Sequence, residues 1–133
     1  MTNEIDLSNK TQLFWKKETI QYRISFLPKL ANLLLENKEE YAQLITKEIN
    51  KPITQSLAEI EKCATLCNYY HENAAKFLAQ KNIKTEVSES YVTYEPLGVI
   101  LGIMPWNFPF WQVFRFAIPT LIAGNTVVVK HAS

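Results

Sequence analysis

Glycine is scarce in this sequence, with three residues among 133, where average usage of about 7% gives roughly nine. They stand at Gly98, Gly102 and Gly124, so a glycine-rich phosphate loop must lie in that segment or be absent. Net charge is also small, at +1. This balance disfavours the basic face of a nucleic-acid binder or of an anionic-membrane binder, and we expect neither partner.

Long uncharged apolar runs and a leader-like start are also missing. No stretch approaches about 18 apolar residues without an interrupting proline or glycine, and the opening residues have no basic start followed by an apolar run. Cys63 and Cys67 are four residues apart on one face of a predicted helix, a poor arrangement for a disulfide. We therefore expect a cytoplasmic protein with reduced thiols.

These cysteines and His71 recur at four-residue steps, which suggests three metal ligands on one helix. Ligands on consecutive turns of one helix span too far to surround a single zinc ion. We expect no metal site, and we assign this face to core packing.

Composition is that of an ordinary globular protein, with 47% apolar and 20% charged residues, but charge is unevenly distributed. All thirteen acidic residues lie at or before Glu95, and Arg115 is the one charged residue from Pro96 to Val129. Such a segment is expected to be buried on both sides and to need partners that cover it.

Apolar periodicity predicts helices in the first part of the chain. Residues 20–34 show one helical face that Pro28 should kink, residues 41–49 form a second short helix, and residues 54–79 form a third, longer one. Residues 84–94 contain β-formers around Val87 and Tyr91 on both sides of a polar turn, which predicts a β-hairpin.

The uncharged segment has the pattern of a strand, a helix and a second strand. Apolar runs at 98–104 and 126–130 flank a helical repeat at 110–123 that ends at Gly124, a plausible left-handed cap. The predicted fold class is α/β: N-terminal helices at 1–82, a short β-hairpin at 83–95, and at 96–133 the first βαβ unit of a Rossmann-like cofactor domain.

Asn107 lies in the turn after the first of these strands, where open α/β sheets bind ligands. Its neutral amide is suited to stabilise a developing oxyanion. Alternatively, Asn107 caps the helix that follows.

Arg115 and Lys130 are the candidate cationic groups of this segment. A guanidinium in apolar surroundings needs a carboxylate, supplied either by a ligand or by a glutamate of the first half. Lys130 ends the second strand. Its ammonium group is expected either to bind ribose hydroxyls or a phosphate, or to be simply solvated at the end of the strand.

Residues 94–133 carry the blocks EPLGV, PWNFP and AGNTVVVK, which closely resemble the aldehyde dehydrogenase superfamily. The upstream helices resemble the amino-terminal helices of the same family, so the resemblance covers the chain after about residue 10. The spelling PWNFPFWQVFR followed by VVVKHAS is most similar to bacterial succinate-semialdehyde dehydrogenases.

The resemblance implies roles for individual residues. Asn107 matches the asparagine that holds the oxyanion, and Arg115 matches an arginine that binds the substrate carboxylate. Lys130 matches the lysine that contacts the adenosine ribose. Ser133 replaces a glutamate of many NAD-preferring members, which makes NADP use plausible. The residues that match the turn on the nicotinamide side of the cofactor cleft are Ile103, Met104, Pro105 and Trp106.

The resemblance also implies an incomplete aldehyde dehydrogenase fold, because the family's nucleophilic cysteine and general-base glutamate lie downstream of residue 133. The intact enzyme is expected to use NAD or NADP, to oxidise a small aldehyde with a carboxylate, and to form a homo-oligomer through residues 83–95. The short aldehyde acids succinate semialdehyde and glutarate semialdehyde both fit. The chain alone is expected to be inactive; the alternative is a non-catalytic oligomerising or complementing module.

Overall fold

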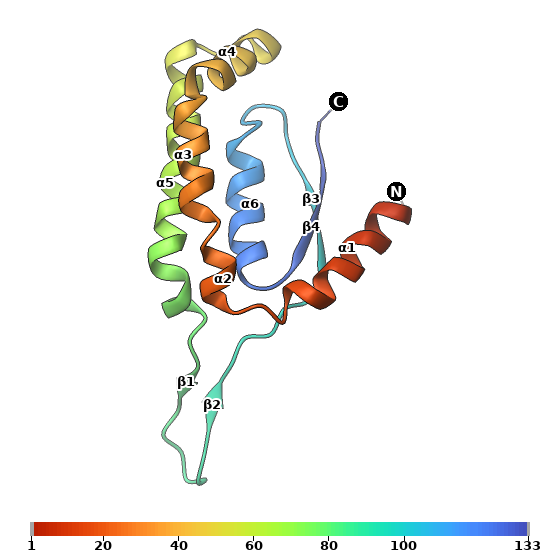
Figure 1. Ribbon diagram of the computed structural model, residues 1–133, viewed down its shortest axis with the longest axis vertical. Coiled ribbons are helices and arrows are strands. Elements are labelled where there is room, and N and C mark those ends of the chain that lie inside the picture. Colours follow the sequence, from red (N-terminus) through yellow and green to blue (C-terminus); the bar gives the residue numbers. More distant parts are fainter. Residues whose placement is uncertain (1, 133) are drawn as a thin grey trace.

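The computed structural model describes residues 2–132. Helices fill its first part, with α3 and α5 side by side and α4 across one end of the pair (Figure 1). Their bounds are α1 Thr2–Trp15, α2 Ile20–Ile24, α3 Leu27–Glu36, α4 Lys38–Ile49 and α5 Ile53–Phe77. The long third helix expected from the sequence is therefore confirmed as α5, and α1 precedes the predicted helices.

The predicted single helix over residues 20–34 is wrong, because the chain forms two helices there. α2 ends at Ile24, and α3 begins at Leu27 with Pro28 in its first turn. A proline costs nothing at that position, since the first N–H groups of a helix have no intrahelical partner. The break therefore precedes Pro28. α4 ends before Pro52, as predicted: its last residue is Ile49, and the C-cap residue Asn50 is in the left-handed conformation with φ 53°.

α5 supplies the centre of the core. Its fully buried Ile60, Cys63 and Cys67 face apolar side chains of α3, α4 and α6. The assignment of the two cysteines to core packing is thereby supported. His71, on the same helix, places Nδ1 3.2 Å from the Ile24 carbonyl oxygen, so this ring is held by the backbone of α2.

The predicted hairpin is present, but its first strand lies earlier than expected. β1 Lys81–Asn82 pairs antiparallel with β2 Tyr91–Val92. Val87, expected within the first strand, is an exposed residue of the connecting loop. Pairing begins at Lys81, shortly after α5 ends at Phe77, and the mostly polar residues 84–90 belong to the connecting loop. The hairpin projects from the helical body (Figure 1).

The predicted βαβ unit is confirmed. β3 Val99–Ile103 and β4 Thr126–Lys130 are parallel, and α6 Trp111–Ile122 connects them. Gly124 has a φ of +90° at the end of α6, as the sequence predicted. The next residue, Asn125, accepts a hydrogen bond from the Gly98 N–H at 2.9 Å and donates one to the Thr120 carbonyl. This side chain therefore links the start of β3 to the end of α6.

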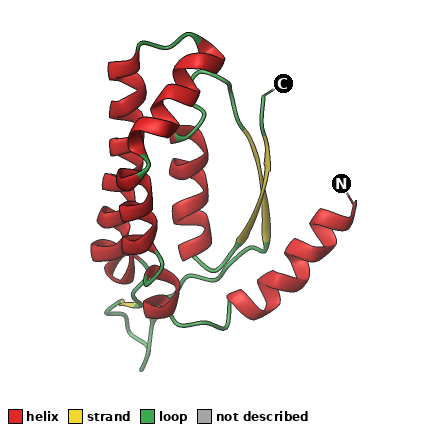
Figure 2. Cartoon of the chain, turned by 45° about the horizontal axis from the view of Figure 1, so that its top comes forward, coloured by secondary structure: helices red, strands yellow, loops and turns green. Residues whose placement is uncertain are grey.

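Burial of the uncharged segment on both sides is not observed among the described residues. α6 packs between the helical layer and the strand pair, and α1 contacts β4 and β3 (Figure 2). Leu101 and Ile103 remain 61% and 74% exposed, and Leu97 is 89% exposed. The expectation fails because no described element covers the outer face of β3 at these positions.

Close packing between β3 and α6 makes Gly102 sensitive to substitution. A Cβ there would lie 2.5 Å from both the Phe116 Cε1 and the Met104 Cε atoms. We expect Gly102→Ala to lower the free energy of unfolding by about 1–3 kcal/mol. Chemical denaturation of the chain measures this loss. Leu101→Ala places the same side chain on the exposed side of β3 and is expected to cost about 0.5 kcal/mol or less; equal losses would show that the close approach is unimportant.

Candidate functional site

The strand register brings the predicted cofactor-binding residues to one edge of the β3–β4 pair. Ile103 is directly opposite Lys130, and the Met104 N–H donates to the Lys130 carbonyl at 3.0 Å. Pro105 and Trp106 follow at once, and both are exposed. The turn from residue 104 to residue 110 therefore lies at the carboxyl ends of parallel strands, the usual ligand position in open α/β sheets.

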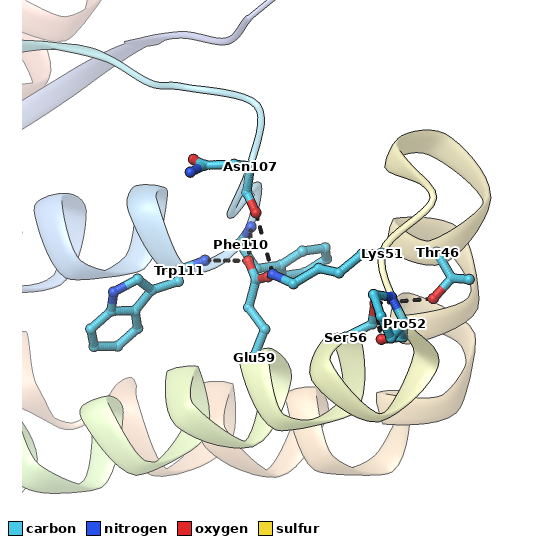
Figure 3. A network of polar contacts seen from close by, with 8 residues as sticks. All are labelled: Thr46, Lys51, Pro52, Ser56, Glu59, Asn107, Phe110 and Trp111. Atoms are coloured by element: carbon cyan, nitrogen blue, oxygen red, sulfur yellow. Dashed lines mark hydrogen bonds and ion pairs between the residues drawn. The ribbon is translucent and has the colours of Figure 1, made fainter.

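A buried carboxylate anchors the end of this turn. Glu59, on α5, accepts hydrogen bonds at Oε1 from the backbone N–H groups of Phe110 and Trp111, both at 2.9 Å (Figure 3). Phe110 is the N-cap residue of α6, and its side chain makes no capping hydrogen bond. Glu59 therefore supplies the acceptor that the helix start lacks, and the positive end of the α6 dipole favours its charge.

A buried ammonium group completes the anchor. Lys51 Nζ donates to Oε2 of Glu59 at 2.5 Å, and their side chains are only 7% and 1% exposed. The same Nζ donates to the Asn107 carbonyl oxygen at 3.3 Å and lies 3.6 Å from the centroid of the Phe108 ring. The burial cost of this cation is thus offset by a carboxylate, a carbonyl and an aromatic face.

Sequence reasoning did not find Lys51 or Glu59. A signal for Glu59 was present, because this carboxylate stands four and eight residues before Cys63 and Cys67 and so continues the buried face of α5. A charged residue on such a face requires a buried partner. Lys51, directly before Pro52, shows no comparable pattern.

The Asn107 side chain is exposed and makes no hydrogen bond to any residue that the structure describes. Its amide points away from Lys51 and Glu59 (Figure 3). The alternative that Asn107 caps the following helix is therefore wrong, because Glu59 occupies the N–H groups of the helix start. The amide remains available to a ligand.

Arg115, on the second turn of α6, is exposed and forms no hydrogen bond or ion pair with residues 2–132. The alternative of a salt bridge to a glutamate of the first half is thus not realised. Trp111, one turn earlier, is covered by another cation, since Lys62 Nζ lies 3.9 Å from its ring centroid. The structure does not link Arg115 to Asn107 by a hydrogen bond, but both have unoccupied donors.

The residues at the ends of β3 and β4 provide part of what a dinucleotide site needs. A hollow of about 490 Å³ borders the turn, lined by Pro105, Trp106 and Pro109 and by residues that follow β4. Lys130 is exposed at the same edge, and its Nζ donates to the carbonyl of the next residue at 2.6 Å, a bond that a ligand hydroxyl can replace. Ser133, predicted to influence cofactor choice, lies outside the described residues.

Burial makes the two cysteines of α5 poor nucleophiles. Desolvation, with a smaller effect from the Glu59 charge, raises the pKa of the Cys63 thiol to about 12. Desolvation likewise raises the pKa of Cys67 to about 11. Because the thiolate is the reactive form of cysteine, neither side chain is suited to attack a ligand at the turn.

A βαβ unit with an exposed, anchored turn at its strand ends is the arrangement in which α/β proteins bind ligands. The aldehyde dehydrogenase family model matches residues 2–133. The chain belongs to this family and corresponds to its N-terminal region, and the match starts earlier than the residue 10 expected from the sequence.

Individual relatives narrow the comparison. The chain is 45% identical over 98% of its length to a probable succinate-semialdehyde dehydrogenase [NADP(+)] of Synechocystis. It is 42% identical over 96% of its length to the succinate semialdehyde dehydrogenase [NAD(P)+] Sad of Escherichia coli. The crystal structure of succinic semialdehyde dehydrogenase from Streptococcus pyogenes with NADP+ matches 98% of the chain at 32% identity and a TM-score of 0.93.

The chain spans 29% of the length of each of these three proteins. Within residues 2–132, no helix is both long and apolar enough to cross a lipid bilayer.

The elevated thiol pKa values predict slow chemical modification of the folded chain. At pH 8 about one thousandth of Cys67 is ionised, given its pKa of about 11, and less of Cys63. We expect both thiols to react with 5,5′-dithiobis(2-nitrobenzoate) at least a hundredfold more slowly in the folded chain than in urea. The folded-state rate should rise with pH up to about 11, because the thiolate fraction grows until the pKa is reached. Rapid reaction of the folded chain at pH 8 would contradict this assignment.

Proposed function

We propose that this chain is part of an enzyme that oxidises succinate semialdehyde to succinate with NAD or NADP. The observation that carries the proposal is the guanidinium of Arg115, on the helix that follows the Asn107 turn, which has no ion-pair partner among residues 2–132. An aldehyde acid offers its aldehyde oxygen to the Asn107 amide and its carboxylate to the Arg115 guanidinium. The two curated relatives described above are named for the same substrate, which supports the choice.

In this proposal Asn107 and Arg115 act on opposite ends of the substrate. The Asn107 amide donates to the aldehyde oxygen, where negative charge develops when a nucleophile attacks the carbon. A neutral donor serves here at a small desolvation cost. Arg115 holds the terminal carboxylate by a charge-assisted pair, which orients the short chain between the two groups.

Cofactor binding is assigned to the edge formed by the β3 and β4 ends. Residues 103–106 form an apolar wall for the nicotinamide side, and Lys130 reaches ribose hydroxyls. The bound dinucleotide supplies the hydride acceptor. Ser133 is small and neutral, so it leaves room for the 2′-phosphate of NADP, and relatives named for NADP(+) and NAD(P)+ support use of either form.

A second candidate function is a non-catalytic oligomerising or complementing module. The observation in its favour is the set of exposed apolar side chains on β3 and on the segments before and after it, namely Leu97, Leu101, Ile103 and Trp106. Such surfaces mark sites of association. The projecting β1–β2 hairpin is the proposed contact with a second copy in a homo-oligomer. A stable monomer in light scattering would count against this function.

The isolated chain is expected to show no dehydrogenase activity. Its two cysteines are buried with elevated pKa values, so no described thiol can attack an aldehyde held at Asn107. The assay follows NADH or NADPH absorbance with succinate semialdehyde and the purified 133-residue chain. The complete enzyme, assayed in parallel, is the positive control. Turnover by the isolated chain would refute the expectation.

Arg115→Ala in the complete enzyme should impair use of the aldehyde acid selectively. Loss of a charge-assisted bond is worth about 1.5–3 kcal/mol, so KM for succinate semialdehyde should rise by about tenfold to hundredfold. KM for propanal, which has no carboxylate, should change by less than about twofold.

Lys62→Ala is the matched control for Arg115→Ala, because it removes a nearby exposed cation that lies on Trp111. It should leave the preference between the two aldehydes unchanged. An equal KM increase for both aldehydes in Arg115→Ala would rule out the carboxylate role.

A further inference from the structure

The turn that carries Asn107 is held at four points by two side chains. Lys51 contacts the Asn107 carbonyl and the Phe108 ring, and Glu59 accepts from the N–H groups of Phe110 and Trp111. The anchors come from α5 and from the residue two positions before it. The backbone that follows the Asn107 side chain is therefore tied to the helical layer (Figure 3).

The bond from Lys51 to the Asn107 carbonyl has a geometric consequence. It restrains the peptide group that follows Asn107 and, with it, the position of the Asn107 Cα atom, which lies in the plane of that group. The place of the amide then depends on the ψ torsion of Asn107 and on the torsions of its side chain. The two bonds to Glu59 fix the start of α6, and with it the helix from which Arg115 projects.

The contribution of a buried ion pair to stability does not by itself explain why Lys51 and Glu59 are found here. The side chains are 7% and 1% exposed, and an apolar pair of similar volume often stabilises a protein as well as a buried ion pair does. Only the charged pair provides directional contacts to a carbonyl and to two N–H groups. Its distinctive contribution is thus geometric.

We propose that Lys51 and Glu59 are positioning residues that hold the Asn107 amide in place to receive the oxyanion. The inference rests on the proposed function, because it assigns the amide a role in catalysis. Neither residue contacts substrate in this assignment. A displacement of about 1 Å in a catalytic group can cost as much as a hundredfold in rate, so the effect should appear in kcat.

The test is a double-mutant cycle in the complete enzyme, with Lys51→Met, Asn107→Ala and the combined variant. Lys51→Met keeps the length of the side chain but removes the donor. We expect kcat for succinate semialdehyde to fall by about tenfold to hundredfold in Lys51→Met, with KM for the dinucleotide within about twofold. In the Asn107→Ala background, Lys51→Met should reduce kcat by less than about threefold further, because the group it positions is gone.

A second variant covers the case in which Lys51→Met does not fold. Glu59→Asp keeps the charge opposite Lys51 but withdraws the carboxylate by one methylene from the Phe110 and Trp111 N–H groups. We expect a smaller fall in kcat, of about threefold to tenfold, which is also lost in the Asn107→Ala background.

Two controls separate positioning from stability. Glu61→Gln, on the same helix, breaks the exposed pair with Lys38 and should leave kcat unchanged. Ile24→Val loosens the core on α2, which contacts the opposite end of α6 through Arg23 and Ile122, and should lower the thermal midpoint without changing kcat.

The possible failures are distinguishable. An active wild-type enzyme with unchanged kcat in Lys51→Met overturns this inference alone. So does a cycle in which the Lys51 and Asn107 effects multiply, because that result indicates a general structural role. Wild-type enzyme that oxidises propanal but not succinate semialdehyde overturns the proposed substrate, and the cycle is then read with propanal. Wild-type enzyme that oxidises neither aldehyde overturns the proposed function, and this inference falls with it.

Discussion

The carboxylate of Glu59 joins the two halves of the chain. One oxygen accepts from the first N–H groups of α6, and the other pairs with Lys51, which in turn reaches the Asn107 carbonyl. The charged helical half thereby holds the uncharged βαβ half at the turn where β3 ends. Without this carboxylate Lys51 would be a buried, unpaired cation, and α6 would start without an acceptor.

The positions of the other candidate residues follow from how α6, β3 and β4 pack beyond the Lys51–Glu59 pair. α6 leaves the anchored turn and approaches β3 so closely at Gly102 that a methyl group would collide with Phe116. The parallel register then puts Lys130 opposite Ile103. Asn125 closes the other end of the unit by linking α6 to the start of β3. The groups at the strand ends are therefore positioned by backbone and core contacts, while their own side chains remain free.

Sequence patterns predicted the features that depend on residues close together in the chain. The apolar periodicity of α5, the two apolar runs of β3 and β4, and the glycine after α6 are properties of neighbouring residues, and the structure confirms them. The Asn107 cap and the burial of Leu101 depend on residues distant in the sequence. An acceptor 51 residues away occupies the Phe110 N–H, and no described element covers Leu101. Such competition between distant partners has no local signature.

Under the proposed function, the chemistry and the choice of substrate are carried by different groups. The neutral Asn107 amide serves the aldehyde oxygen of any aldehyde, so it does not discriminate among substrates. Arg115 alone, among the candidate residues, recognises a feature that only some aldehydes have. Because the buried pair anchors the turn and the start of α6 but does not contact Arg115, a change at that exposed position can alter specificity without disturbing the oxyanion donor. The two roles are separate because Asn107 lies beside the Lys51–Glu59 pair, whereas Arg115 lies on the exposed surface of α6.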